Sequence, residues 1–169
     1  MDLTVDYSDV DPQSIGESNF AKPGWYHLRI DNVTEFTDYL QFTCMIVGTV
    51  PGNESEIGKT VKERLYGTTV FKKIISTIQV ATGLVTKDDI QKMKDNGIKI
   101  TLNPHDFLGT SCVGYYKEDS YEKDGVVKKN TKIGFGWYHP ESETAVNSGV
   151  KLSEAVLASA ASGEFDAFA

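Results

Sequence analysis

The sequence Trp25-Tyr26-His27-Leu28-Arg29-Ile30 follows Lys22-Pro23-Gly24 and sets the pattern for the chain. Tyr26, Leu28 and Ile30 alternate with the other residues, and successive side chains of a β-strand point to opposite faces. This alternation predicts a strand that begins after the Pro-Gly pair and buries these three side chains. Its other face carries an indole, an imidazole and a guanidinium, an unusual set to leave facing water unless a ligand stacks on it.

Two further segments repeat this alternation, residues 39–47 and residues 59–66. Their inward side chains are predicted to be Leu40, Phe42, Cys44, Ile46, Val61 and Leu65. Their outward side chains are predicted to include Tyr39, Lys62, Arg64 and Tyr66. Three consecutive strands are thus expected to expose aromatic and basic groups on the same surface.

A helical pattern follows the third strand. Apolar residues recur at helical spacing between residues 71 and 78, and Gly83 ends the run, which predicts the one long helix. A second, shorter helix is expected over residues 87–96, with Thr86 as its N-cap and Asp88 in its first turn.

The end of the predicted domain returns to strands. Residues 98–102 are a candidate short strand, and residues 110–118 and 128–138 form a predicted pair, joined around the turn Asp124-Gly125. Three strands, a helix and two strands, in the order β-β-β-α-β-β, predict a mainly β protein. The fold class is the oligonucleotide-binding (OB) fold, a five-stranded partly open barrel, here with one or two short helices and flexible acidic termini. In this fold one strand face and two loops bind oligomers.

The formal charge of −7 is unevenly distributed along the 169 residues. Residues 1–20 hold five acidic and no basic residues, and residues 141–169 hold five acidic residues and one lysine. By contrast, residues 59–132 hold 14 basic and 9 acidic residues, a net charge of +5. An acidic protein thus contains a basic body, which is the pattern expected of a nucleic-acid groove flanked by competing tails.

The length suits one domain with a substantial core. We predict an acidic flexible leader over residues 1–20, an OB-fold domain over residues 21–140 and a flexible tail over residues 141–169. Cys44 and Cys112 lie in apolar strands without metal-ligand spacing and are interpreted as reduced core residues. No signal-like leader and no apolar run long enough for a membrane helix is present, so we expect a cytoplasmic protein without membrane contact.

Several segments together resemble the phage-encoded single-stranded DNA-binding proteins of the OB type. The resemblance rests on residues 23–30, on residues 42–48 with the glycine-containing turn after them, and on the strand at residues 108–113. The acidic, phenylalanine-containing tip at residues 163–169 also fits, although Ala169 follows its last phenylalanine. The resemblance covers about residues 20–140 and the tip. It implies sequence-tolerant binding of single-stranded DNA in phage replication or recombination, in the cytoplasm of the bacterial host.

Such a site needs cations along the phosphates and aromatic faces for the bases. The side chains expected to contact DNA are Trp25, His27, Arg29, Tyr39, Lys62, Arg64, Tyr66, Tyr115, Lys117, Lys128, Lys129 and Lys132. Strand parity leaves open whether Tyr115 or Tyr116 is the outward ring. Taken singly, Trp25 would equally suit a plug at the barrel end, and each lysine an ordinary solvated charge.

The tip implies a second set of contacts. The resemblance assigns the capture of replication or recombination proteins to Glu164, Phe165, Asp166 and Phe168. From the tail alone, an ordinary frayed terminus is an equal alternative. The sequence implies no cofactor or metal and leaves homo-oligomerisation open.

Three other classes of function are possible alternatives to DNA binding. The three histidines, His27, His105 and His139, lack the spacing of a metal site or of any catalytic motif, so no enzyme is predicted. The main alternative to DNA binding is a phage tail or capsid β protein that uses its aromatic face for subunit contacts. A carbohydrate-binding module would also use Trp and Tyr platforms, but it would not need the basic cluster.

Overall fold

The computed structural model describes residues 4–8, 12, 21–66 and 71–161. Within these ranges only the backbone is described for Phe71, Asp119, Tyr121 and residues 129–132, 134–135 and 160–161.

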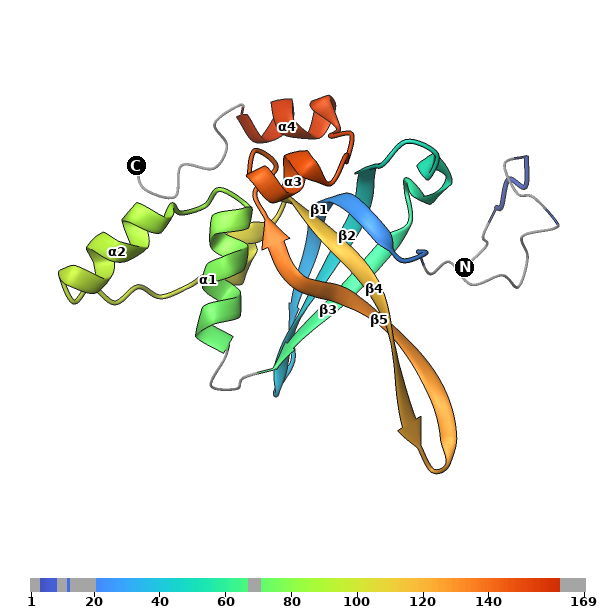
Figure 1. The fold of residues 1–169 in the computed structure, drawn as a ribbon, viewed down its shortest axis with the longest axis horizontal. Helices are drawn as coiled ribbons and strands as arrows, with labels where there is room; N and C mark the ends of the chain where they lie inside the picture. The colour runs from blue at the N-terminus through green and yellow to red at the C-terminus, as the bar shows by residue number, and fades with distance from the viewer. Residues whose placement is uncertain (1–3, 9–11, 13–20, 67–70, 162–169) are drawn as a thin grey trace.

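Five antiparallel strands form one sheet in the order β3-β2-β1-β4-β5 (Figure 1). The strands are β1 (Gly24–Glu35), β2 (Tyr39–Thr49), β3 (Thr60–Tyr66), β4 (Ser111–Lys123) and β5 (Val126–Tyr138). The helices are α1 (Phe71–Ala81), α2 (Lys87–Asp95), α3 (Glu143–Asn147) and α4 (Glu154–Ala161), with short 3-10 turns at Glu54–Glu56 and Pro104–Phe107. The element order from β1 to β5 places the one long helix between the third and fourth strands, as the sequence predicts.

The two edge strands, β3 and β5, approach each other without a continuous ladder. The side-chain oxygen Oε2 of Glu63 on β3 accepts a hydrogen bond of 2.9 Å from the backbone N–H of Ile133 on β5. A carboxylate thus satisfies a donor that a neighbouring strand would satisfy in a closed barrel. The fold is mainly β, and its partly open barrel confirms the predicted OB fold class.

The predicted inward face is the core. Every member of the inward set except the half-buried Leu40 is buried, and α1 adds Ile75 and Ile78. At the centre, the Phe42 ring meets Phe107 and Trp137 edge to face, with centroids 5.3 Å and 6.0 Å away. Each fully buried large apolar side chain stabilises the fold by about 1.5–3 kcal/mol. The alternation along the strands thus selects the side chains whose burial stabilises this sheet.

The central strand β1 is bent by two register shifts, between His27 and Leu28 and between Ile30 and Asn32. Such bulges increase the bend and twist of a strand. β1 can therefore pair with β4 along residues 24–29 and with β2 along residues 26–35.

One predicted strand is not formed. Residues 98–102 belong to no helix or strand, because none of the described strands pairs with them. The preceding helix α2 begins where its sequence predicts: Thr86 and Asp89 form a reciprocal capping box at its N-terminus.

Past residue 140, where the sequence predicts a flexible tail, the described chain continues as α3 and α4 against one end of the barrel (Figure 1). We call residues 150–161 the C-terminal strap. The backbone N–H of Lys151 donates to the Thr49 carbonyl (2.9 Å), the N–H of Ser153 donates to Nδ1 of His27 (3.0 Å), and Val156 is buried. The composition of this segment did not predict that it would be ordered, because the stability of short helices comes mainly from tertiary packing.

Gly48 permits the strap to approach β2. A Cβ at this position would lie 2.3 Å from the Lys151 carbonyl oxygen and 3.1 Å from the His27 Cβ. Since the first of these atoms belongs to the backbone, it can move away only if the strap moves with it.

We expect Gly48→Ala to release the strap. The amides of residues 151–157 should then exchange with solvent at least about tenfold faster, because their docking contacts open, while the β1–β2 ladder keeps its protection. Hydrogen–deuterium exchange measures both. Gly24→Ala is the matched control, since its added Cβ would meet the flexible Asn53 side chain at 3.3 Å. Unchanged protection of the strap in Gly48→Ala would contradict this account.

Candidate nucleic-acid interface

The outer surface of β1, β2 and β3 carries most of the residues predicted to bind DNA. Lys62, Arg64 and Tyr66 are exposed on β3, and Tyr39 is half-buried on β2. The ladder aligns Tyr39 with Tyr66, Gln41 with Arg64, and Thr43 with Lys62. These positions therefore form cross-strand rows on one face, as the alternation predicts.

Three aromatic rings stack at the end of the β1–β2 hairpin. We call Phe36, Tyr39 and Tyr66 the hairpin aromatic cluster. The Phe36 and Tyr39 ring centroids are 4.6 Å apart with an interplanar angle of 21°, and the Tyr39 and Tyr66 centroids are 5.1 Å apart at 44°. Phe36 and Tyr66 are 46% and 51% exposed. Such exposed stacked rings offer flat apolar faces on which unpaired bases can stack.

Phe36 is a candidate site residue that the sequence reasoning missed. It lies in the turn between β1 and β2, where its backbone N–H donates to the Tyr39 carbonyl (2.9 Å). The alternation of inward and outward side chains assigns a face only to residues within strands. It therefore made no prediction for a ring in the turn. An aromatic residue in the short segment between two predicted strands was the available signal.

Two cations, Arg64 and Lys62, lie on β3 together with Tyr66. The Arg64 guanidinium carbon lies 5.4 Å from the centroid of the Tyr39 ring, within cation–π range, and Arg64 Nε donates to Gln41 Oε1 at 3.2 Å. Among the described residues, neither Arg64 nor Lys62 forms an ion pair with a carboxylate. Their charges are therefore available to phosphate groups.

Arg29 is already matched with an anion. Its Nε lies 2.6 Å from Oδ1 of Asp31, and its Nη2 donates to Asp31 Oδ2 (3.2 Å) and to Met45 Sδ (3.5 Å). The hydrogen bond to Asp31 raises the pKa of Arg29 further. A phosphate would have to displace Asp31, which lies in the bulge of β1, so Arg29 is a weaker phosphate ligand than the sequence suggests.

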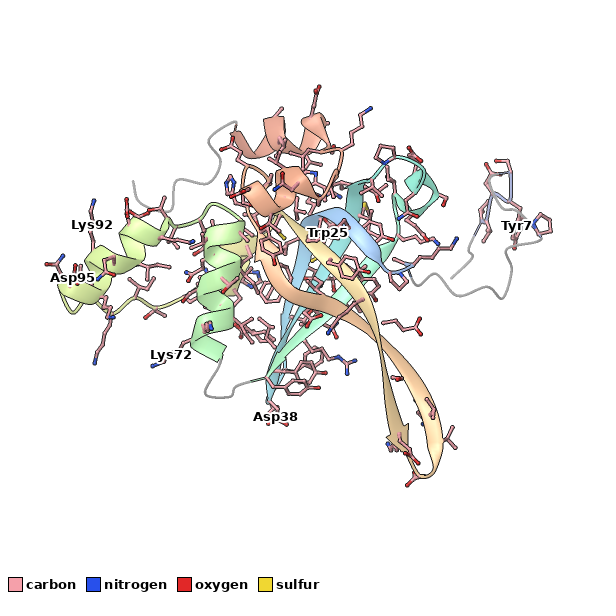
Figure 2. All side chains as sticks on the ribbon, viewed as in Figure 1. Tyr7, Trp25, Asp38, Lys72, Lys92 and Asp95 are labelled. Carbon is pink, nitrogen blue, oxygen red and sulfur yellow. The ribbon has the colours of Figure 1, made fainter. Side chains whose placement is uncertain are left out.

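A second group of rings lies at the other end of β1. We call Trp25, Tyr115 and Tyr138 the barrel-end aromatic cluster. The Trp25 ring centroid is 5.4 Å from that of Tyr115 and 5.9 Å from that of Tyr138. Figure 2 places Trp25 far from Asp38, which follows Phe36 in the hairpin turn. Ten residues of β1 span about 30 Å, so the two aromatic clusters lie near opposite ends of this strand.

The structure settles which neighbouring tyrosine faces outward. Tyr115 is 39% exposed and pairs with Trp25 across the β1–β4 ladder, whereas Tyr116 is 2% exposed in the core. The orientation of Tyr138 depends on Gly136, because a Cβ there would lie 2.2 Å from the Tyr138 ring.

The expectation that His27 faces solvent is wrong. Its side chain points away from the core, as predicted, but the strap covers it completely, and its Nδ1 accepts the Ser153 N–H. Nε2 is buried, and no residue in the described part of the chain forms a hydrogen bond with it. Burial lowers the pKa of His27 to about 4, so the ring is neutral at pH 7. It is removed from the candidate surface while the strap is docked.

The predicted lysines of the last two strands lie on a projecting hairpin. Beyond Tyr116, β4 pairs with β5 alone, and Figure 1 shows this ribbon extending away from the barrel. The ladder places Lys117 opposite Lys132, Ser120 opposite Lys129 and Tyr121 opposite Lys128. Lys117 is half-buried and Lys128 exposed, while the side chains of Lys129 and Lys132 are outside the described set.

The tip residues Glu164, Phe165, Asp166 and Phe168 lie outside the described residues, as does most of the leader. Among the described residues no group of three or more His, Cys, Asp or Glu side chains could hold a metal ion. In the same part of the chain no helix combines the length and apolar character needed to cross a bilayer. Comparison with known protein families and with curated proteins gives no match.

The buried imidazole predicts a specific pH dependence of stability. As the pH falls below about 6.5 the unfolded chain binds a proton at His27, whereas the folded chain binds it only near pH 4. The free energy of unfolding should therefore decrease with falling pH, by up to about 1.4 kcal/mol per pH unit and about 2 kcal/mol in total between pH 6.5 and 5.

Urea unfolding at several pH values measures this slope. His27→Gln keeps an acceptor for the Ser153 N–H but does not titrate, so its stability should be flatter over the same interval. A slope identical to that of the wild type would show that other groups cause the dependence.

Proposed function

We propose that this protein binds single-stranded DNA without strong sequence preference, through the outer face of β1, β2 and β3 and the projecting β4–β5 hairpin. The observation that carries the proposal is the hairpin aromatic cluster, in which the exposed Phe36 and Tyr66 flank Tyr39 and Arg64 lies over the Tyr39 ring. Among the described residues, no carboxylate forms an ion pair with Arg64 or with Lys62, further along β3. Stacking on aromatic rings contributes about 1–3 kcal/mol per base, and only unpaired bases offer both faces for it.

The charge distribution supports the same proposal. The region from residue 59 to residue 132 carries +5, although the whole chain carries −7. Within this region, β3 and the β4–β5 hairpin, which flank the partly open seam of the barrel, hold seven of the 14 basic residues and five of the nine acidic residues. A phosphate backbone that follows these elements would meet cations on both sides of its path.

The biological role follows from the resemblance to phage single-stranded DNA-binding proteins. The protein would protect single-stranded DNA during phage replication or recombination in the bacterial cytoplasm. Glu164, Phe165, Asp166 and Phe168 would recruit partner enzymes. This role needs no catalytic group, cofactor or metal.

The alternative function, a structural β protein of a phage particle, uses the same rings for subunit contacts. The two functions differ in their response to salt. Cations that bind phosphates release counterions from DNA, so the affinity falls steeply as salt rises, whereas apolar subunit contacts are nearly insensitive to salt.

The deciding experiment titrates the protein with fluorescent oligo-dT and with a duplex of the same length at two salt concentrations. We expect oligo-dT to bind more tightly, with an affinity that falls steeply with salt. Tyr39→Ala and Phe36→Ala should each weaken binding by about 1–3 kcal/mol, or about 5- to 150-fold in Kd, because each removes a stacking face.

Val146→Ala is the control for these substitutions, since Val146 is an exposed residue of α3. It should bind like the wild type. No oligo-dT binding at low salt, or equal binding by Tyr39→Ala and the wild type, would refute the proposal; large assemblies insensitive to salt would favour the structural alternative.

The acidic tip should compete with DNA. Removal of residues 162–169 keeps the strap and should raise the affinity for oligo-dT several-fold at low salt, because two acidic side chains no longer reach the cationic surface. The gain should shrink at high salt through screening. The full-length double variant Glu164→Gln with Asp166→Asn separates charge from the phenylalanine rings. Unchanged affinity in both variants would remove competition from the proposal.

A further inference from the structure

Residues 87–101 have little contact with the rest of the described protein, whereas Leu102 is half-buried against the core. α2 has no buried residue, and Figure 1 shows it on the opposite side of the molecule from the β4–β5 hairpin. A nine-residue helix is too short to be stable by itself in water. Packing against another surface would stabilise α2.

The residues after α2 have the composition of a strand. Ile98-Lys99-Ile100-Thr101-Leu102 contains three β-branched residues and alternates apolar and polar side chains, the pattern of a half-buried strand. Yet Ile98 and Ile100 are 54% and 53% exposed. Within the described chain, residues 98–102 make one backbone–backbone hydrogen bond, from the Ile98 N–H to the Met93 carbonyl (2.9 Å).

We propose that residues 98–102 pair with the same residues of a second copy of this chain, as an antiparallel two-stranded ladder across a two-fold axis. The segment then forms the strand that its sequence predicts, with a partner that the single chain does not provide. Exposed strand edges of this kind are templates for pairing with another chain. A closed two-fold contact also limits the assembly to a dimer.

The charges select one register for this ladder. If the axis passes through Ile100, Ile100 faces its own copy, Ile98 faces Leu102, and Lys99 faces Thr101. If the axis instead passed through Lys99, two lysines would be directly opposed, which is unfavourable. The register centred on Ile100 therefore pairs apolar with apolar side chains and keeps the lysines apart.

The charge pattern of α2 is complementary to itself in the same arrangement. Its first turn holds Lys87, Asp88 and Asp89, a net charge of −1, and its last turn holds Lys92, Lys94 and Asp95, a net charge of +1. The two-fold axis that makes the two strands antiparallel also relates the two helices. If the axis is perpendicular to α2 as well, the acidic end of one helix lies toward the basic end of the other. This complementarity favours a second copy over an unrelated peptide, which would have no reason to match both the strand and the helix.

Sedimentation velocity over a concentration series from about 1 to 100 µM tests the dimer, a range suited to a small interface. We expect the wild type to change from monomer to dimer within the series. The double variant Ile98→Asp with Ile100→Asp should remain monomeric, since it places carboxylates at the ladder. Val146→Asp, at an exposed position on α3, should dimerise like the wild type.

Cysteine substitution tests the register. Ile100→Cys should form a disulfide-linked dimer on mild oxidation, because the two copies of residue 100 face each other. Thr101→Cys should not, because its two copies lie diagonally, beyond about 7 Å. The native Cys44 and Cys112 are buried and should not contribute. A wild type that stays monomeric, a dimer unaffected by the two aspartates, or equal crosslinking at both positions would overturn the proposal.

These outcomes are independent of DNA binding. The Ile98→Asp, Ile100→Asp variant changes no residue of the hairpin aromatic cluster or of the β4–β5 hairpin. It should therefore bind oligo-dT per monomer like the wild type if the proposed function holds. Failure of the dimer and failure of DNA binding can thus be told apart in one set of proteins.

Discussion

The pairing of β1 with two neighbours is the constraint on which the rest of the structure depends. β1 joins β2 through most of its length and β4 through its first half, and the two register shifts let it follow both. A slip of one residue would turn Tyr26, Leu28 and Ile30 to the outside and place Trp25 and Arg29 in the core. The separation of a buried wall from an outer wall with rings and cations therefore follows from the register of this one strand.

The outer wall is itself divided by tertiary contacts. Near the barrel end, the C-terminal strap covers His27 and approaches Gly48, where the absence of a Cβ gives it room. Near the β1–β2 turn no described element covers Phe36 or Tyr66, which stay exposed. The proposed DNA surface is thus open at the hairpin aromatic cluster and restricted beside Trp25, so in this proposal single-stranded DNA would meet stacking faces first at the hairpin end.

The two proposed contacts use different parts of the molecule. The proposed DNA surface lies on β1, β2, β3 and the projecting hairpin, while the proposed self-association uses α2 and residues 98–102, and α2 lies on the side of the molecule opposite the hairpin. A dimer formed in this way would present two DNA surfaces without covering either one. Because linked sites raise the effective concentration of the second contact, such a dimer would hold a long single strand more tightly than one copy does.

The sequence alone determined the inward residues of the strands, the positions of α1 and α2, and the mainly β order, because alternation and capping act between residues close along the chain. It also placed Lys62, Arg64 and Tyr66 together on one face. Only the tertiary structure decided that Tyr115 rather than Tyr116 faces outward, that Phe36 stacks on Tyr39, that Asp31 neutralises Arg29 and that His27 is covered. Local periodicity gives the side of a strand to which a residue points, whereas what lies against that side depends on segments up to 126 residues away, as between His27 and Ser153.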